Sequence, residues 1–465
     1  MTKKQAGRRP VVSIRDKRIL LRSPGLRLAR RTARNIARRT ARSTWQFTAG
    51  GSWTQRLRPS ARHNLRSFWF DGLFAASSNE ILLAYLTLFL LALDATPAQI
   101  GLLSSLSSLA AAAMLLPGAA WVERQGQRKR IVLLTGGGAA RLALMLMPLV
   151  PLFFTGPTAV YVVIALAVAR DAFSQLGMPA WTSLTADIVP LEWRGRFFSS
   201  RNIAVGLVKI PLIYLIGLLI ARTSTPGNPL GYQLALGFAF AIGLAATVSY
   251  ALIREPDISP TQAGGSTSWK AFTQHLRAHP EFLTFCATAA LWNLAVRIAG
   301  PFFSVYLVES LKATPDVVGI LSTVSTLTAL PAQRLFGVMV DRWGARRVQI
   351  VTGLIIPLMP LGWILTRSPW HTVPIHILSG FLWAGYNLAN FNLLLTITPE
   401  DLRPRYTALY QVIVMVSLAI GSALGGVVIE QWGYYVVFVL SGVGRFAAAL
   451  VFALLGRKKA KDPQL

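Results

Sequence analysis

Ionisable side chains stand inside several long apolar segments of this 465-residue chain. Glu80 lies near the middle of the first segment and shares one helical face with Ser77, Ala84 and Thr87. A charge at the centre of a bilayer costs at least about 2.5 to 3.5 kcal/mol on insertion scales, so it usually faces a water-filled cavity. A carboxylate there can cycle between protonated and ionised forms. We therefore predict that Glu80 couples transport to protons, with a structural pair to a nearby Lys or Arg as the alternative.

Four further charges fall at mid-depth in other segments. Arg170 and Asp171 are adjacent in the fourth segment, Lys209 lies in the fifth and Arg297 in the seventh. Because neighbours on a helix do not face each other, Arg170 and Asp171 need not pair. An excess of cations would favour an anionic substrate, but salt bridges between helices explain the same residues equally well. We place these residues with Glu80 on a substrate or proton pathway and leave the charge of the substrate open.

The tenth segment carries a polar and aromatic set. Trp383, Asn387 and Asn390 share one helical face, and Trp292 and Asn293 stand in the seventh segment. Together they are suited to an amphipathic ligand, although Trp and Asn more often pack and hydrogen-bond against a neighbouring helix.

Enzymatic chemistry is not indicated. The chain has no Walker loop, no metal-ligand cluster and no Ser/His/Asp set, and its five histidines form no convincing ligand set. The single cysteine, Cys286, excludes an intrachain disulfide framework. We expect no cofactor, no bound metal and no enzyme activity.

The composition indicates a membrane protein. The chain is 53% hydrophobic and only 14% charged, and its mean hydropathy is +0.49, whereas soluble domains are about 25% charged. Apolar stretches of about 20 residues, the length that crosses a bilayer as a helix, recur along the chain. We predict an all-α integral membrane fold with twelve transmembrane helices in two six-helix bundles. The predicted segments are 68–93, 97–121, 131–153, 158–188, 197–221 and 231–253, then 281–308, 315–340, 347–366, 371–398, 405–429 and 434–456.

These segments divide the chain into five regions. A basic tail (1–66) precedes the first bundle (67–253), a polar linker (254–280) leads to the second bundle (281–457), and a short C-terminal segment (458–465) follows. The tail holds 19 Lys and Arg against one acid, Asp16. It suits either a basic amphipathic helix on anionic lipid or a disordered extension. Nucleic-acid binding and an organelle transit peptide are less favoured, because no folded binding motif and no cleavage site are visible.

Basic residues also predict the orientation, because Lys and Arg in short loops resist translocation. The tail and alternate loops are rich in them, whereas the opposite loops offer only Arg222, Lys312 and Arg367. We therefore expect both termini in the cytoplasm and a bacterial-type inner membrane as the location.

One loop occurs twice. Its copies, Glu123-Arg124-Gln125-Gly126-Gln127-Arg128 and Asp341-Arg342-Trp343-Gly344-Ala345-Arg346, start 218 positions apart and follow the second and eighth segments. A second correspondence links 190–197, after the fourth segment, to 399–406, after the tenth. Two matches at equivalent loops favour duplicated six-helix halves that rock around a site at the midplane.

At these loops the chain resembles the major facilitator superfamily over roughly 67–457. The second copy fits the family signature well with Gly337, Asp341, Arg342, Gly344 and Arg346, whereas the first copy has Glu123 for the usual Asp. The resemblance implies that the loop is a conformational latch on the cytoplasmic side. It assigns a gating role to Glu123, Arg124, Gly126, Arg128, Gly337, Asp341, Arg342, Gly344 and Arg346, with Asp187 as an acid partner. The alternative is that the charged residues of these loops are solvated and only set the orientation in the membrane.

The preferred function is a secondary active transporter of a small solute, monomeric and working by alternating access with proton coupling through Glu80. The alternative is a membrane receptor or anchor that works through its basic tail. Substrate, direction and coupling ion are not fixed by the residues.

Overall fold

The computed structural model describes residues 54, 57–225, 227–255, 275–399 and 403–455. Every regular element in these ranges is a helix, apart from one isolated β-bridge between Thr225 and Asn228. The C-terminal segment and most of the predicted tail and linker lie outside the described residues. Within the described part, the all-α prediction is confirmed.

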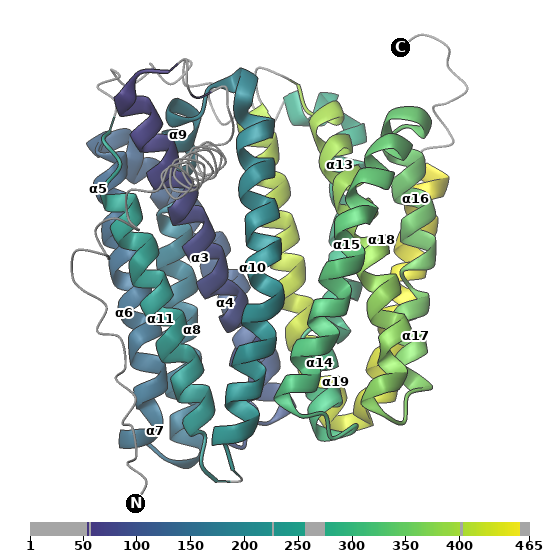
Figure 1. Cartoon of the computed structure of the whole chain (residues 1–465). Helices are drawn as coiled ribbons and strands as arrows, with labels where there is room; N and C mark the ends of the chain where they lie inside the picture. The colour runs from purple at the N-terminus through teal and green to yellow at the C-terminus, as the bar shows by residue number, and fades with distance from the viewer. Residues whose placement is uncertain (1–53, 55–56, 226, 256–274, 400–402, 456–465) are drawn as a thin grey trace, which may run out of the picture.

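Residues 59–251, the first half, form the helices to the left in Figure 1. Its long helices are α3 (Pro59–Leu91), α4 (Pro97–Gln125), α8 (Gly156–Leu176), α10 (Arg194–Thr223) and α11 (Leu230–Ala251). The third predicted segment is broken into α5 (Arg128–Leu134), the π-helix η2 (Thr135–Ala139), α6 (Ala140–Leu146), η3 (Met147–Leu149) and α7 (Val150–Phe153). After α8 come α9 (Met178–Ile188) and the short η4 (Leu191–Trp193).

Residues 280–455, the second half, repeat this order. They form α13 (Pro280–Ala299), α14 (Phe302–Glu309), α15 (Pro315–Trp343), α16 (Ala345–Ile355), α17 (Leu358–Ile364), η5 (Pro369–Thr372), α18 (Val373–Ile397) and α19 (Arg403–Leu455). The backbone of α19 leaves helical geometry at Gly433, where φ is 78°.

Nine helical stretches of the described chain are long and apolar enough to cross a membrane. This set counts α19 once and leaves out α15 and α18, which are 29 and 25 residues long. If α19 is divided at Gly433 and these two helices are added, the total is the twelve crossings that the sequence predicts. We keep twelve as our interpretation.

Local sequence sets the helix ends. Thr96 accepts from Gln99 N, Gln99 Oε1 accepts from Thr96 N, and Pro97 occupies the first turn of α4, as predicted. The repeated loops turn at glycines with positive φ, 66° at Gly126 and 81° at Gly344. The positive φ at this position therefore explains why each copy has a glycine there.

The first helix begins earlier than predicted. α3 starts at Pro59 rather than at 68, so the boundary drawn at 66 cuts through this helix. Leu65 is fully buried, and Asn64 bonds to the backbone of Arg254 through both its amide nitrogen (2.7 Å) and its oxygen (2.9 Å). Residues 59–66 thus pack on the end of the first half and are not part of a separate tail.

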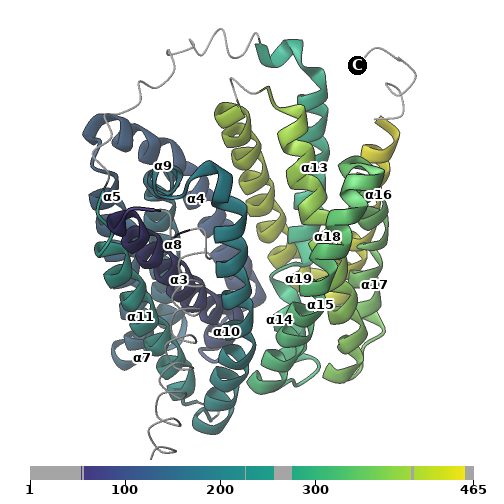
Figure 2. The ribbon, with the colours of Figure 1, turned by 45° about the horizontal axis from the view of Figure 1, so that its top comes forward.

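The basic repeated loops lie together at one end of the molecule, at the top of Figure 1, which we call the basic end. The opposite loops, around Asp94, Lys312 and Gly433, define the far end. Figure 2 shows the two halves side by side from a tilted view. The halves meet where α4 packs on α19 and α10 packs on α15.

The closest approaches between the halves lie toward the far end. A Cβ on Gly101 of α4 would stand 2.7 Å from the carbonyl oxygen of Ser422, and one on Gly217 of α10 would stand 2.6 Å from that of Pro315. Ala98 N also donates to Glu430 Oε1 at 3.3 Å. Backbones in contact across this boundary keep the far end closed.

Candidate functional site

A cavity of about 570 Å³ lies at mid-depth between the two halves. We call it the central cavity; its walls come from α3, α4 and α8 of the first half and from α13, α14 and α19 of the second, together with Gly300 and Pro301. Its polar lining residues are Asn79, Thr87, Ser104, Ser107, Ser108, Arg170, Asp171, Ser174, Gln175, Arg297 and Ser304. A volume of this size and a lining rich in hydroxyl and amide groups suit a small polar solute.

Arg170 organises one wall of the central cavity. Its Nη1 donates to Asp171 Oδ1 at 2.6 Å, and its Nη2 donates to Asn79 Oδ1 at 2.8 Å. The Asp171 side chain is 34% exposed, so it stays within reach of a solute, whereas the Arg170 side chain is only 12% exposed. The adjacent residues do pair, which the sequence had left open.

Arg297 lies in the opposite wall, on α13. Its Nε is buried without a hydrogen-bond partner, and no carboxylate of the described residues lies within salt-bridge distance of its guanidinium. The chain breaks from α13 to α14 at Gly300 and Pro301, one turn further on. The central cavity therefore has a paired arginine on one side and, on the other, an arginine without an acid partner in the part of the chain that the structure describes.

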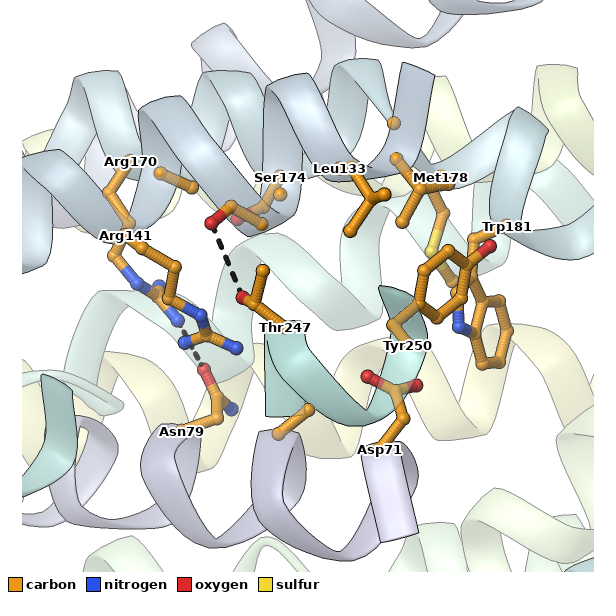
Figure 3. A pocket seen from close by; sticks show the side chains of 16 residues that line it. Asp71, Asn79, Leu133, Arg141, Arg170, Ser174, Met178, Trp181, Thr247 and Tyr250 are labelled. Atoms are coloured by element: carbon orange, nitrogen blue, oxygen red, sulfur yellow. Dashed lines mark hydrogen bonds between the residues drawn. The ribbon is translucent and has the colours of Figure 1, made fainter. Parts of the chain in front are cut away.

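A second space of about 300 Å³, the side chamber, lies inside the first half (Figure 3). Asn79, Arg170 and Ser174 line both spaces and so form the wall between them. The π-helix η2 contributes Gly136 and Gly137, whose missing side chains leave room. The side chamber thus adjoins the central cavity behind Arg170.

Asp71 is a buried acid that sequence reasoning missed. It lies on α3, is 8% exposed and faces the side chamber with Trp181 and Tyr250 (Figure 3). The nearby Arg201 lies on α10, where its side chain packs against Gly72 of α3 and its guanidinium carbon lies 4.7 Å from the ring centroid of Phe198. The sequence does contain a signal for this site: Asp71 is an acid inside the first apolar segment, on the helical face opposite to that of Glu80.

Glu80 forms an ion pair with Lys209, and neither residue is among those that line the central cavity. Its Oε2 lies 2.7 Å from Lys209 Nζ on α10, and the two side chains are 25% and 24% exposed. Gly206, one turn before Lys209 on α10, lies close to the second half. A Cβ placed on Gly206 would be 3.5 Å from the side chain of Leu330 on α15. The pair therefore sits where α3, α10 and the second half come together, and the structural pair expected as an alternative is present.

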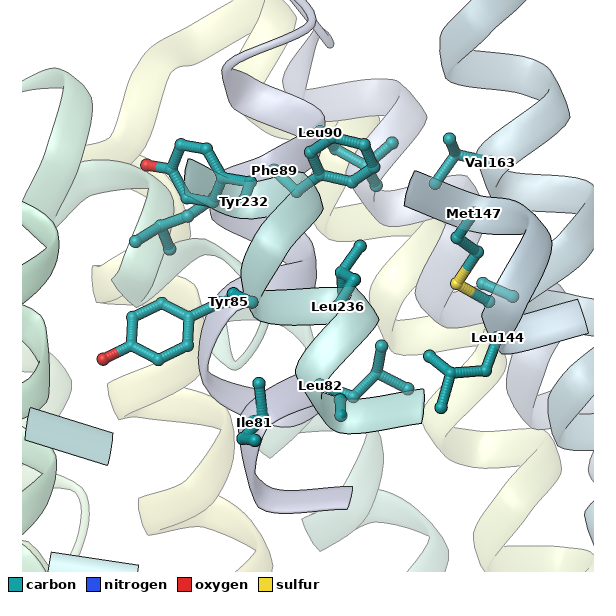
Figure 4. Close-up of a cluster of buried hydrophobic side chains, with 14 of the residues drawn as sticks. Ile81, Leu82, Tyr85, Phe89, Leu90, Leu144, Met147, Val163, Tyr232 and Leu236 are labelled. Atoms are coloured by element: carbon teal, nitrogen blue, oxygen red, sulfur yellow. The ribbon is translucent and has the colours of Figure 1, made fainter. Parts of the chain in front are cut away.

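The buried face of α3 fixes the direction of Glu80. Ile81, Tyr85 and Phe89 pack against the cluster that includes Leu144 and Leu236 (Figure 4). Tyr85 Oη also donates to the carbonyl oxygen of Ile213 at 2.5 Å. Because this face is locked in the core, the carboxylate of Glu80 is held toward α10.

The first repeated loop is fastened within its own half. Arg128 forms an ion pair with Asp187, donates to Ser183 Oγ at 3.0 Å and lies 3.5 Å from Glu255 Oε1. These bonds tie the start of α5 to the end of α9. Arg124 and Gly126 are exposed, and the side chain of Glu123 lies outside the described part.

The second loop differs in its contacts. Asp341, Arg342 and Gly344 are exposed, and among the described residues neither Asp341 nor Arg342 forms a salt bridge. Arg346 reaches the carbonyl oxygen of Phe452 at 3.5 Å, and a Cβ on Gly337 would meet no atom within 4 Å. The contact described for Arg346 thus lies within its own half.

The predicted set on the tenth segment is dispersed. Trp383 lines a different space inside the second half, Asn387 is exposed, and Asn390 bonds to Tyr410 Oη at 3.0 Å. Asn293 donates to the carbonyl oxygen of Ala289 in its own helix at 2.8 Å. None of these four is among the residues that line the central cavity, so we do not include them in its binding surface.

A model of the Major Facilitator Superfamily matches residues 68–297 and again residues 285–465. The chain belongs to the Major Facilitator Superfamily. It is therefore a multi-pass membrane transporter and not an enzyme, and the resemblance at the repeated loops is confirmed.

Similar proteins include transporters of several kinds. Sugar efflux transporter A of Dickeya chrysanthemi is 25% identical over 353 residues, which are 72% of this chain and 80% of that protein. A point variant of the nucleoside transporter NupG superposes with a TM-score of 0.65 at 15% identity, covering 84% of this chain and 98% of that one. A bacterial homologue of the human lysosomal transporter Spinster, inward-facing and unoccupied, also has a TM-score of 0.65 at 14% identity, covering 88% of this chain and 100% of that one. At these identities the solved structures show the fold alone.

Because the two loops differ in their contacts, we expect substitutions of their acidic residues to have unequal effects on stability. Asp187→Asn should lower the free energy of unfolding by about 1 kcal/mol, because it removes a partly buried partner of Arg128. Asp341→Asn should change it by less than about 0.5 kcal/mol, because Asp341 is exposed and forms no salt bridge with another described residue. Unfolding of both purified variants in the same detergent checks the difference. Equal losses of stability would contradict the asymmetry.

Proposed function

We propose that the chain moves a sugar or a similar hydroxylated solute across the inner membrane by alternating access, coupled to protons. The observation that carries the proposal is the lining of the central cavity. Six of its polar residues are Ser or Thr, two carry amides, and Arg170 with Asp171 offers a donor and an acceptor side by side. A sugar presents hydroxyl groups that both donate and accept, so such a wall can replace its hydration.

The name of the Dickeya chrysanthemi relative supports this substrate class and suggests outward movement. We place the basic end in the cytoplasm, following the distribution of Lys and Arg. The conformation described here, with contacts between the halves at the far end, then corresponds to an inward-facing state. The reverse state requires the far-end contacts to break while the loops of the basic end engage.

Glu80 and Lys209 are the proposed coupling pair. Protonation of Glu80 removes one charge of the pair and leaves Lys209, whose side chain is only 24% exposed, without its partner on the helix that packs against α15, and an unpaired charge with little exposure is costly. If α10 packs against α15 differently in the inward-facing state and in the reverse state, protonation of Glu80 changes the relative stability of these two states. Loading of the proton is linked in this way to movement of the halves.

The remaining expectations complete the proposal. The transporter works as a monomer, both termini lie in the cytoplasm, and anionic lipid is the partner of the basic residues before Pro59. The latch residues of the two loops act on the cytoplasmic side, with Asp187 as the acid partner of the first copy.

Substrate counterflow in proteoliposomes tests the substrate class. Vesicles preloaded with one unlabelled solute are diluted into traces of the labelled solute, across a panel of monosaccharides, disaccharides, nucleosides and amino acids. We expect transient accumulation of at least one sugar, and none in vesicles without the protein. Accumulation of nucleosides or amino acids but of no sugar would contradict the proposed class.

A further inference from the structure

The second half contains a space of its own, which we call the rear cavity. It measures about 220 Å³ and lies at the break between α13 and α14. Gly300 lines both cavities. All of its lining residues come from the second half, so it is distinct from the proposed substrate site: Val296, Gly300, Phe303, Met359, Trp363, Ile375, His376, Ser379, Trp383 and Arg445.

Arg445 is the only charged residue among these lining residues. It is 2% exposed, its Nη2 donates to the carbonyl oxygen of Val296 at 3.2 Å, and its Nε is buried without a partner. No carboxylate of the described residues lies within salt-bridge distance of it. A guanidinium has five N–H donors, and a buried cation needs an anion or several acceptors to offset its desolvation. The rear cavity therefore holds a cation without a counterion among the described residues.

The walls around Arg445 are aromatic. Trp363 and Phe303 pack with ring centroids 5.0 Å apart, and Trp383 is also among the lining residues. His376 adds a ring 6.0 Å from Trp363, and its Nε2 is buried without a partner. Flat aromatic walls favour a planar apolar group, whereas the guanidinium favours a carboxylate in two-point contact.

We propose that the rear cavity is a second binding site, which takes a small planar carboxylate such as an aromatic acid. The carboxylate lies against Arg445 and the ring lies between Trp363 and Trp383. Gly300 places the bound ligand against the break between α13 and α14, so occupancy bears on a helix that also lines the central cavity.

Calorimetric titration of the purified full chain with benzoate tests the site, in a buffer without other carboxylates. We expect saturable binding of one benzoate per chain, and binding of the uncharged benzamide at least about tenfold weaker. Arg445→Met should weaken benzoate binding by at least about tenfold. Arg347→Met, which removes an exposed arginine of the second loop, should bind benzoate as the unaltered chain does.

A second variant keeps the test independent of the buried charge. Ser379→Leu fills the rear cavity while Arg445 stays in place, and we expect it to abolish benzoate binding. Unchanged binding in both Arg445→Met and Ser379→Leu would overturn the proposal, as would the absence of saturable binding at millimolar benzoate. Loss of binding in Arg297→Met alone would also overturn it, because it would place the anion in the central cavity.

Discussion

Glu80→Gln is expected to abolish sugar accumulation driven by a pH gradient while leaving sugar exchange intact. The glutamine resembles the protonated carboxyl and cannot release a proton, so the ion pair with Lys209 never reforms. One pH unit is worth about 1.4 kcal/mol, enough for about tenfold accumulation at one proton per sugar. In the variant, the ratio of accumulated sugar to external sugar should fall to about one. Labelled sugar in proteoliposomes, measured with and without an imposed gradient, gives both quantities.

Glu192→Gln is the matched control, because Glu192 is exposed in the short η4 helix at the basic end. It should accumulate sugar as the unaltered chain does. Accumulation at full strength in Glu80→Gln would show that the pair with Lys209 is structural. Loss of exchange together with accumulation would assign Glu80 to substrate binding instead of coupling.

Arg170→Met is expected to have the largest effect on the central cavity. The change leaves Asp171 without its partner and Asn79 Oδ1 without its donor, in the wall between the central cavity and the side chamber. Breaking a buried pair costs about 3–5 kcal/mol, and we expect about 2 kcal/mol here because Asp171 is partly exposed. Sugar exchange should fall by at least about tenfold.

The double variant Arg170→Met with Asp171→Asn separates stability from binding. Removing the carboxylate as well should restore most of the lost free energy of unfolding, because no unpaired charge remains. Exchange should stay low, because the donor and acceptor that face the solute are both gone. Unfolding in detergent and counterflow in vesicles measure the two effects. A double variant that regains exchange would contradict direct binding by Arg170.

The architecture was predictable because it follows from periodic and compositional features. Apolar segments, alternating basic loops and the duplicated loop indicated an all-helical, two-part transporter, and the positive φ values of Gly126 and Gly344 explain why the motif needs glycine. The residues at which the helices begin were less predictable. α3 begins at Pro59 because Leu65 and Asn64 pack on the end of the first half, and a hydropathy pattern does not register such contacts.

The sites were only partly predictable for a physical reason. A charge in an apolar segment marks a cavity or a partner, and Arg170, Asp171 and Arg297 do line the central cavity. Which cavity a side chain faces depends on helix rotation and packing. Trp383 therefore lies in the rear cavity and Asp71 in the side chamber, although one was expected on the substrate pathway and the other was overlooked. The pairing of Glu80 with Lys209 likewise depends on how α3 packs against α10.

Proton movement driven by a sugar gradient alone tests the central claim most directly. The unaltered chain is reconstituted with a pH-sensitive dye inside the vesicles, and a sugar found by counterflow is added outside with no pH gradient. The account predicts a change of internal pH that requires the sugar and is absent with Glu80→Gln. Exchange of labelled sugar at full rate with no change of internal pH would contradict proton coupling in this transporter.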